Sequence, residues 1–136
     1  WQLGEEKFFE ALRRFAYPTK EVAAMTNGNQ VRFVDTEDFV KLCSEIAGED
    51  LGWWFEVYVR TGGLPRIEHQ LVDGVLHLKW VTPKNLPFSM TIPVSIGGTE
   101  YAVRMPDGKA EMKIGNAEYK IDPSKRLLMA KARKLK

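Results

Sequence analysis

The sequence predicts an α+β protein, in which an N-terminal helical segment precedes a seven-stranded antiparallel immunoglobulin-like β-sandwich. Apolar residues recur at spacings of three and four before residue 63, which is the period of a helix, and at a spacing of two afterwards, which is the period of a strand. The period changes at Gly62-Gly63-Leu64-Pro65, where glycine and proline interrupt regular structure. We therefore expect a helical part at residues 1–63 and a β-sandwich domain at residues 64–136.

The composition is that of a soluble globular protein, with 44% apolar and 28% charged residues in a chain of 136. No apolar run approaches the ~18 residues of a membrane span. A single cysteine excludes an intrachain disulfide framework. Charge follows the same division as the period, because residues 1–63 carry a net charge of −4 and residues 64–136 a net charge of +6. Since the chain begins with Trp1 and not with methionine, we expect residues to precede it.

The first expected helix begins near Gly4 and ends before Pro18, which cannot continue a helix. Its apolar face consists of Phe8, Ala11, Leu12, Phe15 and Ala16. A short helix at Lys20–Met25 is expected next. A brief strand with Val31 and Phe33 on one side follows the turn at residues 27–29.

The second expected helix starts at Thr36, its N-cap, and ends at Gly48, its C-terminal cap. Its buried stripe consists of Phe39, Leu42, Cys43, Ile46 and Ala47. A third helix follows Asp50, which we expect to cap it. The apolar residues of that helix, at i, i+3, i+4, i+7 and i+8, are Leu51, Trp54, Phe55, Tyr58 and Val59.

The aromatic stripe of the third helix has more than one interpretation. We interpret it as core that packs against neighbouring elements. An exposed aromatic platform built from Trp53 is the alternative. A membrane-surface role is poorly supported, because the polar face carries Glu49, Asp50 and Glu56 and no basic cluster.

Short alternating runs separated by turn signals fill the second part of the chain. The first hairpin turns at Asp73-Gly74 and pairs Val72 with Val75. The longest run places on one side Phe88, Met90, Ile92, Val94 and Ile96. Further strands are expected around residues 101–105, 110–114, 119–121 and 127–130.

Two features of this region carry expectations of their own. Pro93 lies inside the longest run and cannot donate to a ladder, so we expect it at a sheet edge or a bulge. The basic residues 129–136 are expected to form a solvated tail, because they lack the aromatic or motif context of a nucleic-acid binder.

The histidines and the cysteine are the residues most able to carry chemistry. Counting outward from the hairpin turn places His69 opposite Leu78 and His77 opposite Gln70, so the two imidazoles project from opposite faces and cannot share a metal. We expect His69 to be semi-buried with its hydrogen bonds satisfied and His77 to face solvent. Cys43 is expected to be a core thiol and not a nucleophile.

No signature of a catalytic or metal site occurs in the sequence. There is no H-E-x-x-H, no G-x-S-x-G, no phosphate-cradling glycine loop and no C-x-x-C. We therefore predict no catalytic, cofactor-binding or metal-binding residue in this chain, and no enzymatic activity for the chain alone.

Several short motifs follow one another in a fixed order. They comprise LGEEKFFEALRRF at the start; Thr36, Asp38 and Phe39; Gly48, Asp50 and Leu51; Trp53, Trp54 and Phe55; Gly63 and Pro65; and IDPSKRLL near the end. This order resembles aminopeptidase-N-like zinc metallopeptidases, the gluzincin aminopeptidases. In that family an L-G-x-x-x-F helix, T-x-D-F, G-x-D-L, a W-F-F helix and G-x-P mark the end of a thermolysin-like catalytic domain and the start of a β-sandwich.

The resemblance implies a parent protein that removes N-terminal residues from peptides with a zinc-activated water. The family's H-E-x-x-H motif, third-ligand Glu, G-x-M-E-N-type motif and catalytic Tyr are absent here and would lie upstream of Trp1. Zinc would therefore belong to the parent and not to this chain. The implied partners are the missing catalytic domain of the same chain and, for the parent, a peptide substrate. Exposed apolar helix faces would also allow self-association. An aminopeptidase and an epoxide-hydrolysing relative both fit these motifs.

Two other functions compete with this one. A stand-alone β-sandwich could bind peptide or glycan through exposed aromatic residues such as Trp80 or Tyr101, although their alternation with polar residues favours core. A nucleic-acid binder built on residues 64–136 would show strongly salt-dependent retention of DNA. We expect no nucleic-acid partner.

Overall fold

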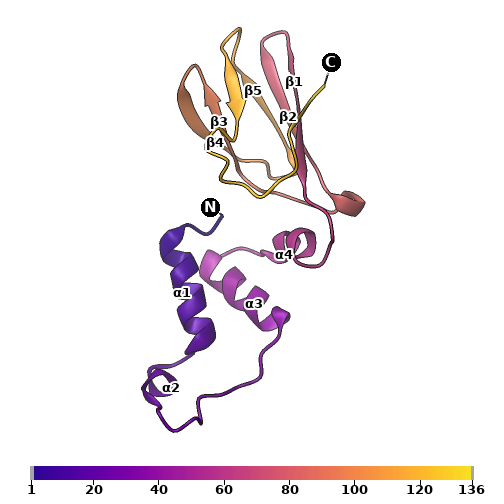
Figure 1. Ribbon diagram of the computed structural model, residues 1–136. Helices are drawn as coiled ribbons and strands as arrows, with labels where there is room; N and C mark the ends of the chain where they lie inside the picture. The colour runs from indigo at the N-terminus through magenta and orange to yellow at the C-terminus, as the bar shows by residue number, and fades with distance from the viewer. Residues whose placement is uncertain (1, 136) are drawn as a thin grey trace. The chain divides into compact units, whose positions relative to one another are not determined.

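The computed structural model describes residues 2–135, and over these residues four α-helices precede strands that form two sheets (Figure 1). The predicted α+β class, with helices first and strands second, is confirmed. Trp1 and Lys136 lie outside the described residues. The chain divides into two compact units, Trp1–Gly52 and Trp53–Lys136, which we call the helical unit and the β unit.

The helical unit contains α1 (Glu5–Ala16), α2 (Lys20–Ala24) and α3 (Thr36–Ala47). The first two helices lie where the sequence predicts them. Contacts between α1 and α3 include an ion pair of Arg14 with Glu45, at 2.7 Å, and the rings of Phe15 and Phe39, whose centres are 4.8 Å apart. Over the described residues only three apolar side chains of this unit are buried, namely Ala11, Cys43 and Leu51.

The start of α3 differs from the prediction by one residue. Asp35, and not Thr36, is the N-cap: its carboxylate accepts from the Asp38 N–H at 3.0 Å, and the Asp38 carboxylate accepts from the Asp35 N–H at 3.1 Å. This reciprocal pair is a capping box, which satisfies two backbone donors at once and so outcompetes a single threonine cap. Gly48 ends the helix in the left-handed conformation, with φ of 79°, as predicted.

The brief strand expected around Val31 and Phe33 is not present, because no strand lies beside this segment in the described part of the helical unit. Residues 31–35 connect α2 to α3 without regular structure.

The aromatic helix α4 (Gly52–Tyr58) starts at the last residue of the helical unit, and its remaining residues belong to the β unit. The side chains of Trp53, Trp54 and Tyr58 pack against the core of the strands, and Val57 is fully buried in that core. Residue Asp50 accepts from the N–H of Gly52 at 2.9 Å, just ahead of the helix. The expected stripe is correct for Leu51 and Phe55 but wrong for Val59, which is exposed. The boundary that the sequence predicts after residue 63 separates α4 from the strands. In the structure, the side chains of α4 pack against the core of these strands.

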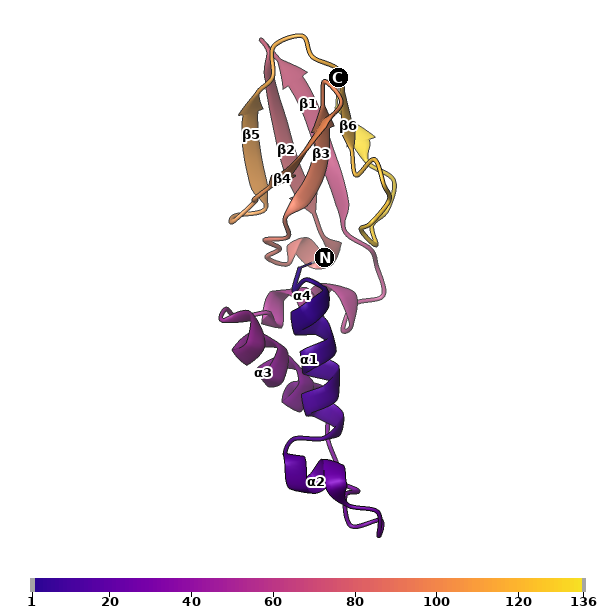
Figure 2. The ribbon, with the colours of Figure 1, turned by 90° about the vertical axis from the view of Figure 1, so that its left-hand side faces the viewer.

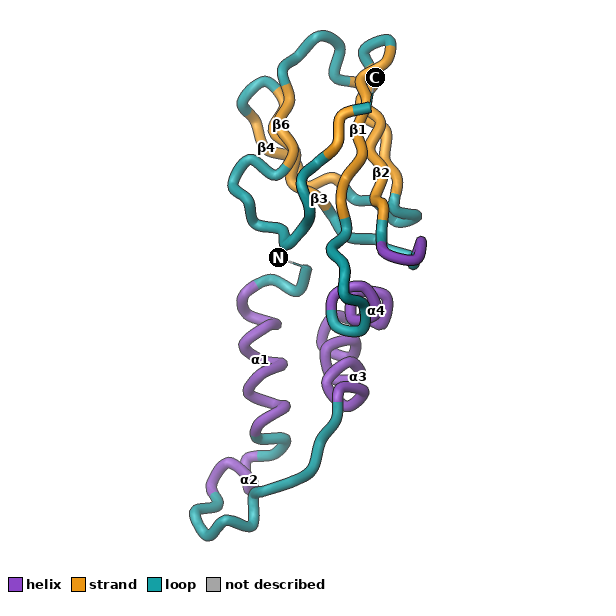
Figure 3. The backbone as a smooth tube through the Cα atoms, turned by 45° about the vertical axis from the view of Figure 1, so that its right-hand side comes forward, coloured by secondary structure: helices purple, strands orange, loops and turns teal. Residues whose placement is uncertain are grey.

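The strands form a four-stranded sheet in the order β5-β2-β1-β7 and a three-stranded sheet in the order β4-β3-β6 (Figures 2 and 3). Their bounds are β1 (Arg66–Val72), β2 (Val75–Val81), β3 (Ile92–Ile96), β4 (Thr99–Val103), β5 (Lys109–Lys113), β6 (Tyr119–Ile121) and β7 (Arg133–Lys134). A short 3₁₀ helix, η1 (Pro83–Asn85), follows β2. Both sheets contribute to one buried cluster, in which Ile67 and Leu76 of the larger sheet join Ile92 and Val94 of the smaller sheet. The β1–β2 register has the predicted pairs, including Val72 with Val75 and His69 with Leu78.

Three predictions about the strands need correction. Residues 88–91 alternate as predicted, with Phe88 and Met90 buried, but only Ile92–Ile96 pair as a strand. Pro93 lies in the central strand of its sheet and not at an edge. Its carbonyl accepts from the Asp122 N–H at 2.8 Å, and the β3–β6 register starts only at Val94. The missing donor of Pro93 therefore falls at the end of the ladder, where it is tolerated.

The third correction concerns the end of the chain. No strand forms at residues 127–130; the last strand is β7, which pairs in parallel with β1. The expected solvated tail is therefore partly ordered, and the N–H of Leu135 donates to the carbonyl of His69 at 2.9 Å. Parallel pairing leaves no local turn signal, which is why residue patterns near the end did not indicate it.

Candidate functional site

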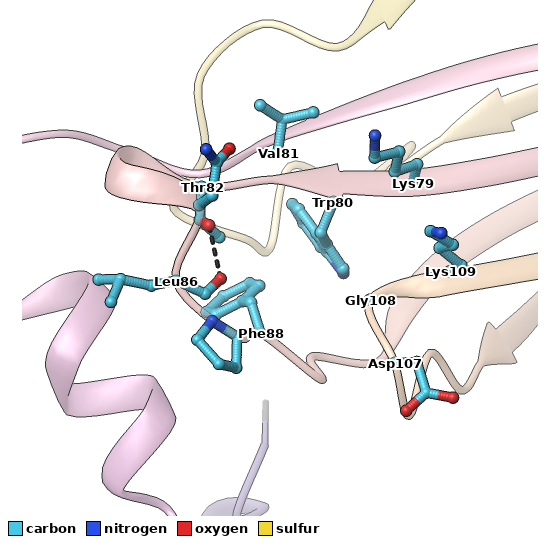
Figure 4. A pocket seen from close by; sticks show the side chains of 11 residues that line it. Lys79, Trp80, Val81, Thr82, Leu86, Phe88, Asp107, Gly108 and Lys109 are labelled. Atoms are coloured by element: carbon cyan, nitrogen blue, oxygen red, sulfur yellow. Dashed lines mark hydrogen bonds between the residues drawn. The ribbon is translucent and has the colours of Figure 1, made fainter.

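A pocket of about 330 Å³ opens in the β unit between the end of β2 and the turn that precedes β5 (Figure 4). Its size falls within the range of small-ligand sites. The lining residues come from two segments of the chain: Lys79, Trp80, Val81, Thr82, Asn85, Leu86, Pro87 and Phe88, and then Asp107, Gly108 and Lys109.

Trp80 forms the inner wall of this pocket and belongs to the core. Its side chain is 5% exposed, its indole N–H donates to the Met90 carbonyl at 2.8 Å, and its ring meets the Phe88 ring edge-on at 5.2 Å. The expectation that Trp80 is core is thus confirmed. Tyr101, the other aromatic residue considered as a platform, is 47% exposed on β4.

The turn that closes the pocket depends on Gly108. Its φ is +69°, and a Cβ at this position would lie 3.0 Å from the Phe88 carbonyl oxygen, so both conformation and space favour glycine. Its own carbonyl accepts from the Trp80 N–H at 2.8 Å. This backbone hydrogen bond therefore connects the Trp80 wall of the pocket to the Gly108 turn.

Charges of both signs stand at the rim. Lys79 and Lys109 lie directly opposite each other in the β2–β5 register, and Asp107 is two residues before Lys109. Like charges at opposed positions destabilise a sheet slightly. The pocket can hold a small ligand between apolar walls and these charges, but it contains no cysteine or histidine that could act as a nucleophile or base.

His69 is half-buried and bonded, as predicted. Its Nδ1 lies 2.9 Å from the Tyr119 hydroxyl, and the two rings meet edge-on at 5.5 Å. Burial, and then the positive charge of Lys134, lower the pKa of His69 below its ordinary value of 6.5. The neutral imidazole is therefore favoured. Burial also raises the pKa of Tyr119, so this hydroxyl stays protonated.

His77 lies on the opposite face of the hairpin, where its Nδ1 is 3.1 Å from a carboxylate oxygen of Glu111. The two histidines do not come together, as the register predicted. Among residues 2–135, no three His, Cys, Asp or Glu side chains gather into a group that could hold a metal ion.

Cys43 is a buried thiol, as predicted, with 2% of its side chain exposed. Burial raises its pKa, which keeps the thiol protonated and unreactive. No helix in the described part of the chain has the length and hydropathy to cross a membrane.

The helical unit exposes many of its large apolar side chains. Eight large apolar side chains are exposed over its described residues: Phe8, Phe9, Leu12, Tyr17, Met25, Val31, Phe33 and Val34. The expected apolar face of α1 exists, but only Ala11 of it is buried. Large exposed apolar patches are typical of surfaces that contact another structure.

Sequence reasoning missed three residues that stabilise the folded units, namely Asp122, Val57 and Arg32. The buried carboxylate of Asp122 accepts from the N–H groups of Arg126 and Leu127, at 2.9 and 3.0 Å. The D-P dipeptide was a signal for this turn, but nothing indicated that the carboxylate is buried. Val57 was missed because it lies off the expected apolar stripe of α4. Arg32, whose guanidinium donates to the Phe15 carbonyl, was missed because it fits no catalytic pattern.

Among solved structures, this fold is similar to part of aminopeptidase A of Legionella pneumophila in complex with aspartic acid. The sequence identity is 21% and the TM-score is 0.51. The likeness covers 84% of this chain, a share larger than either compact unit, so it extends over parts of both. It covers only 13% of the other chain. No protein-family model matches this chain, and no curated protein matches it. This chain therefore shares the fold of a segment of that aminopeptidase.

Proposed function

We propose that this chain is a structural portion of a zinc-dependent metallo-aminopeptidase and carries none of the zinc site itself. The helical unit would complete a catalytic domain, and the β unit would follow it as a spacer. The parent would hydrolyse peptide bonds at N-terminal residues of peptides. Its zinc and its catalytic groups would lie in the remainder of the longer protein.

The exposed apolar surface of the helical unit carries this proposal. Three buried apolar side chains are too few to stabilise about fifty residues alone, because small domains bury little surface and are marginal. Eight large apolar side chains remain at its surface. A unit of this kind is best understood as part of a larger folded domain, which the residues outside this chain would supply.

The fold likeness supports the same conclusion. A protein named as an aminopeptidase contains a segment with this fold, and that segment makes up 13% of its chain. The ordered motifs of the sequence, from Thr36 to Pro65, support the gluzincin family independently of the fold.

We further propose that the β unit is an immunoglobulin-like β-sandwich. The chain forms the β1–β2 hairpin in one sheet, crosses to form β3–β4 in the other, returns to place β5 beside β2, and crosses again to place β6 beside β3. This alternation supports the Greek-key connectivity that is typical of such sandwiches. The shared core between the sheets supports it.

The experiment that tests the proposal is to determine the reading frame upstream of the Trp1 codon and to assay the encoded full-length protein. We expect an H-E-x-x-H motif with a downstream glutamate, and release of N-terminal residues from peptides that stops when zinc is chelated. A start codon or an unrelated domain immediately upstream would contradict the proposal.

A stand-alone binding module is the second candidate, because the pocket beside Trp80 has the size of a ligand site. Titration of the isolated chain with peptide and glycan panels tests it. Saturable binding that Lys79→Ala and Lys109→Ala weaken would favour this candidate over the structural one.

A further inference from the structure

The segment between α2 and α3 exposes three apolar side chains, Val31, Phe33 and Val34. Val31 is 79% exposed and Phe33 is fully exposed. The backbone between the two helices runs without helical turns at this point (Figure 3). Exposure of two large apolar groups two residues apart is unusual for a connection, because connections on a finished surface are mostly polar.

Arg32, between these two residues, is anchored to α1. Its guanidinium donates to the Phe15 carbonyl in the last turn of that helix, and it stands 5.4 Å from the centre of the Phe15 ring. Arg32 therefore holds the backbone of this segment against α1, while the side chains of Val31 and Phe33 on either side of it remain exposed.

Both ends of the segment are also fixed. The Val31 N–H donates to the Gly28 carbonyl at 3.3 Å, and Asp35 is held by the capping box of α3. A segment fixed in this way loses little conformational entropy when something binds it.

Within residues 2–135, several backbone N–H groups of the segment are not used in hydrogen bonds. Over the described residues, the N–H groups of Arg32, Phe33 and Val34 donate to no acceptor. Valine and phenylalanine favour strands. Unpaired backbone groups next to exposed apolar side chains are the features of an edge strand that lacks its neighbour.

We propose that residues 31–34 pair, as an edge strand, with a strand of the remaining part of the same longer protein, and that Phe33 is buried in that contact. The proposal rests on the proposed function, which supplies this remaining part. A second copy that pairs through the same segment fits less well, because it would bring together two copies of residues 1–63, each with a net charge of −4. In the similar aminopeptidase, most of the chain lies outside the matching segment, so ample protein is available to provide the strand.

Hydrogen exchange of the isolated 136-residue chain and of the full-length protein tests this pairing. In the isolated chain we expect the amides of Arg32, Phe33 and Val34 to exchange at the rate of an open segment. In the full-length protein, pairing should slow at least one of each two neighbouring amides by about 100-fold or more.

Substitutions at Phe33 provide the second readout. Phe33→Asp should lower the melting temperature of the full-length protein by about 4 °C or more, because it would bury a charge in the contact. It should change that of the isolated chain by no more than about 1 °C. Phe33→Ile keeps an apolar strand former and should preserve stability in both. Val72→Asp, at a half-exposed position of the β1–β2 hairpin, serves as the matched control.

The outcomes separate this inference from the proposed function. If α1 amides become protected in the full-length protein while those of residues 32–34 stay open, the inference is overturned and the proposed function stands. If no part of the helical unit gains protection, both fail. Protection that appears in the isolated chain as its concentration rises would identify a second copy as the occupant and would overturn the inference.

Discussion

The helical unit and the β unit contain similar proportions of apolar residues but bury them to different extents. Thirteen apolar side chains are buried in the described part of the β unit, against three in that of the helical unit. In the β unit two sheets and α4 close over one cluster. In the helical unit, the apolar face of α1 meets α3 along part of its width and leaves Phe8 and Leu12 exposed.

Amphipathic periodicity therefore identifies an apolar face but not what covers it. The spacing of the α1 residues is as regular as that of the strand residues, yet only Ala11 of the expected α1 face is buried. Only the strands find their cover within this chain. The contrast between the two units leads to three predictions, each with a matched control variant.

The largest effect is expected in the core of the β unit. Trp80→Ala removes a side chain that is 5% exposed, together with its hydrogen bond to the Met90 carbonyl. We expect a loss of about 3–5 kcal/mol in the free energy of unfolding, because a large cavity remains. Chemical denaturation followed by near-ultraviolet circular dichroism measures it.

Tyr101→Ala is the control, since this aromatic side chain of the same unit is 47% exposed. It should cost less than about 1 kcal/mol. Similar costs for the two variants would mean that the β unit has no well-packed core and would remove the contrast between the units. Loss of ligand binding by Trp80→Ala at unchanged stability would instead favour the binding module.

How far the sequence predicts this structure depends on whether the information is local. The His69–Leu78 pairing followed from one turn, Asp73-Gly74, and a count of residues, and the structure has that register. The ends of α1 and α3 followed from Gly4, Pro18 and Gly48, within one or two residues. These features depend on neighbours in sequence.

Features that depend on distant partners were predicted poorly. The parallel pairing of β7 with β1 joins residues 65 positions apart, such as Glu68 and Arg133, and no local signal marks it. The position of Pro93 in a central strand depends on where β6 stops pairing with β3. The pocket beside Trp80 depends on a turn that lies 28 residues later, at Gly108. The side of α4 that carries Val57 faces a core that only the folded strands create.

A smaller effect is expected in the helical unit, where little core supports α3. Asp35→Ala removes the carboxylate that accepts from the Asp38 N–H and leaves the capping box incomplete. We expect a cost of about 1 kcal/mol. The loss should be visible as reduced helicity at 222 nm at temperatures where the strands remain folded, because three buried apolar side chains give this unit a small reserve of stability.

Asp35→Asn is the matched variant, since its amide oxygen can still accept the bond and should retain most of the stability. If Asp35→Ala left the helicity unchanged up to the unfolding of the strands, the helical unit would be as firmly held as the β unit. The contrast drawn from their cores would then be wrong.

The smallest effect is expected from the pH dependence of the β unit, which tests the half-buried contact of His69 with Tyr119. Burial and Lys134 lower the pKa of His69 in the folded state below its ordinary value of 6.5, so the unfolded chain binds more protons than the folded chain as the pH falls through that value. The contribution of His69 is complete above pH 6.5 and is lost progressively below it. We expect the free energy of unfolding to fall over this range in the wild type and in His77→Gln, and to fall less in His69→Gln. If His69→Gln had the same pH dependence as the wild type, the neutral imidazole of His69 would contribute nothing to the packing of β1 against β6. His69 would then be accessible to solvent although it lies in the unit with the larger core.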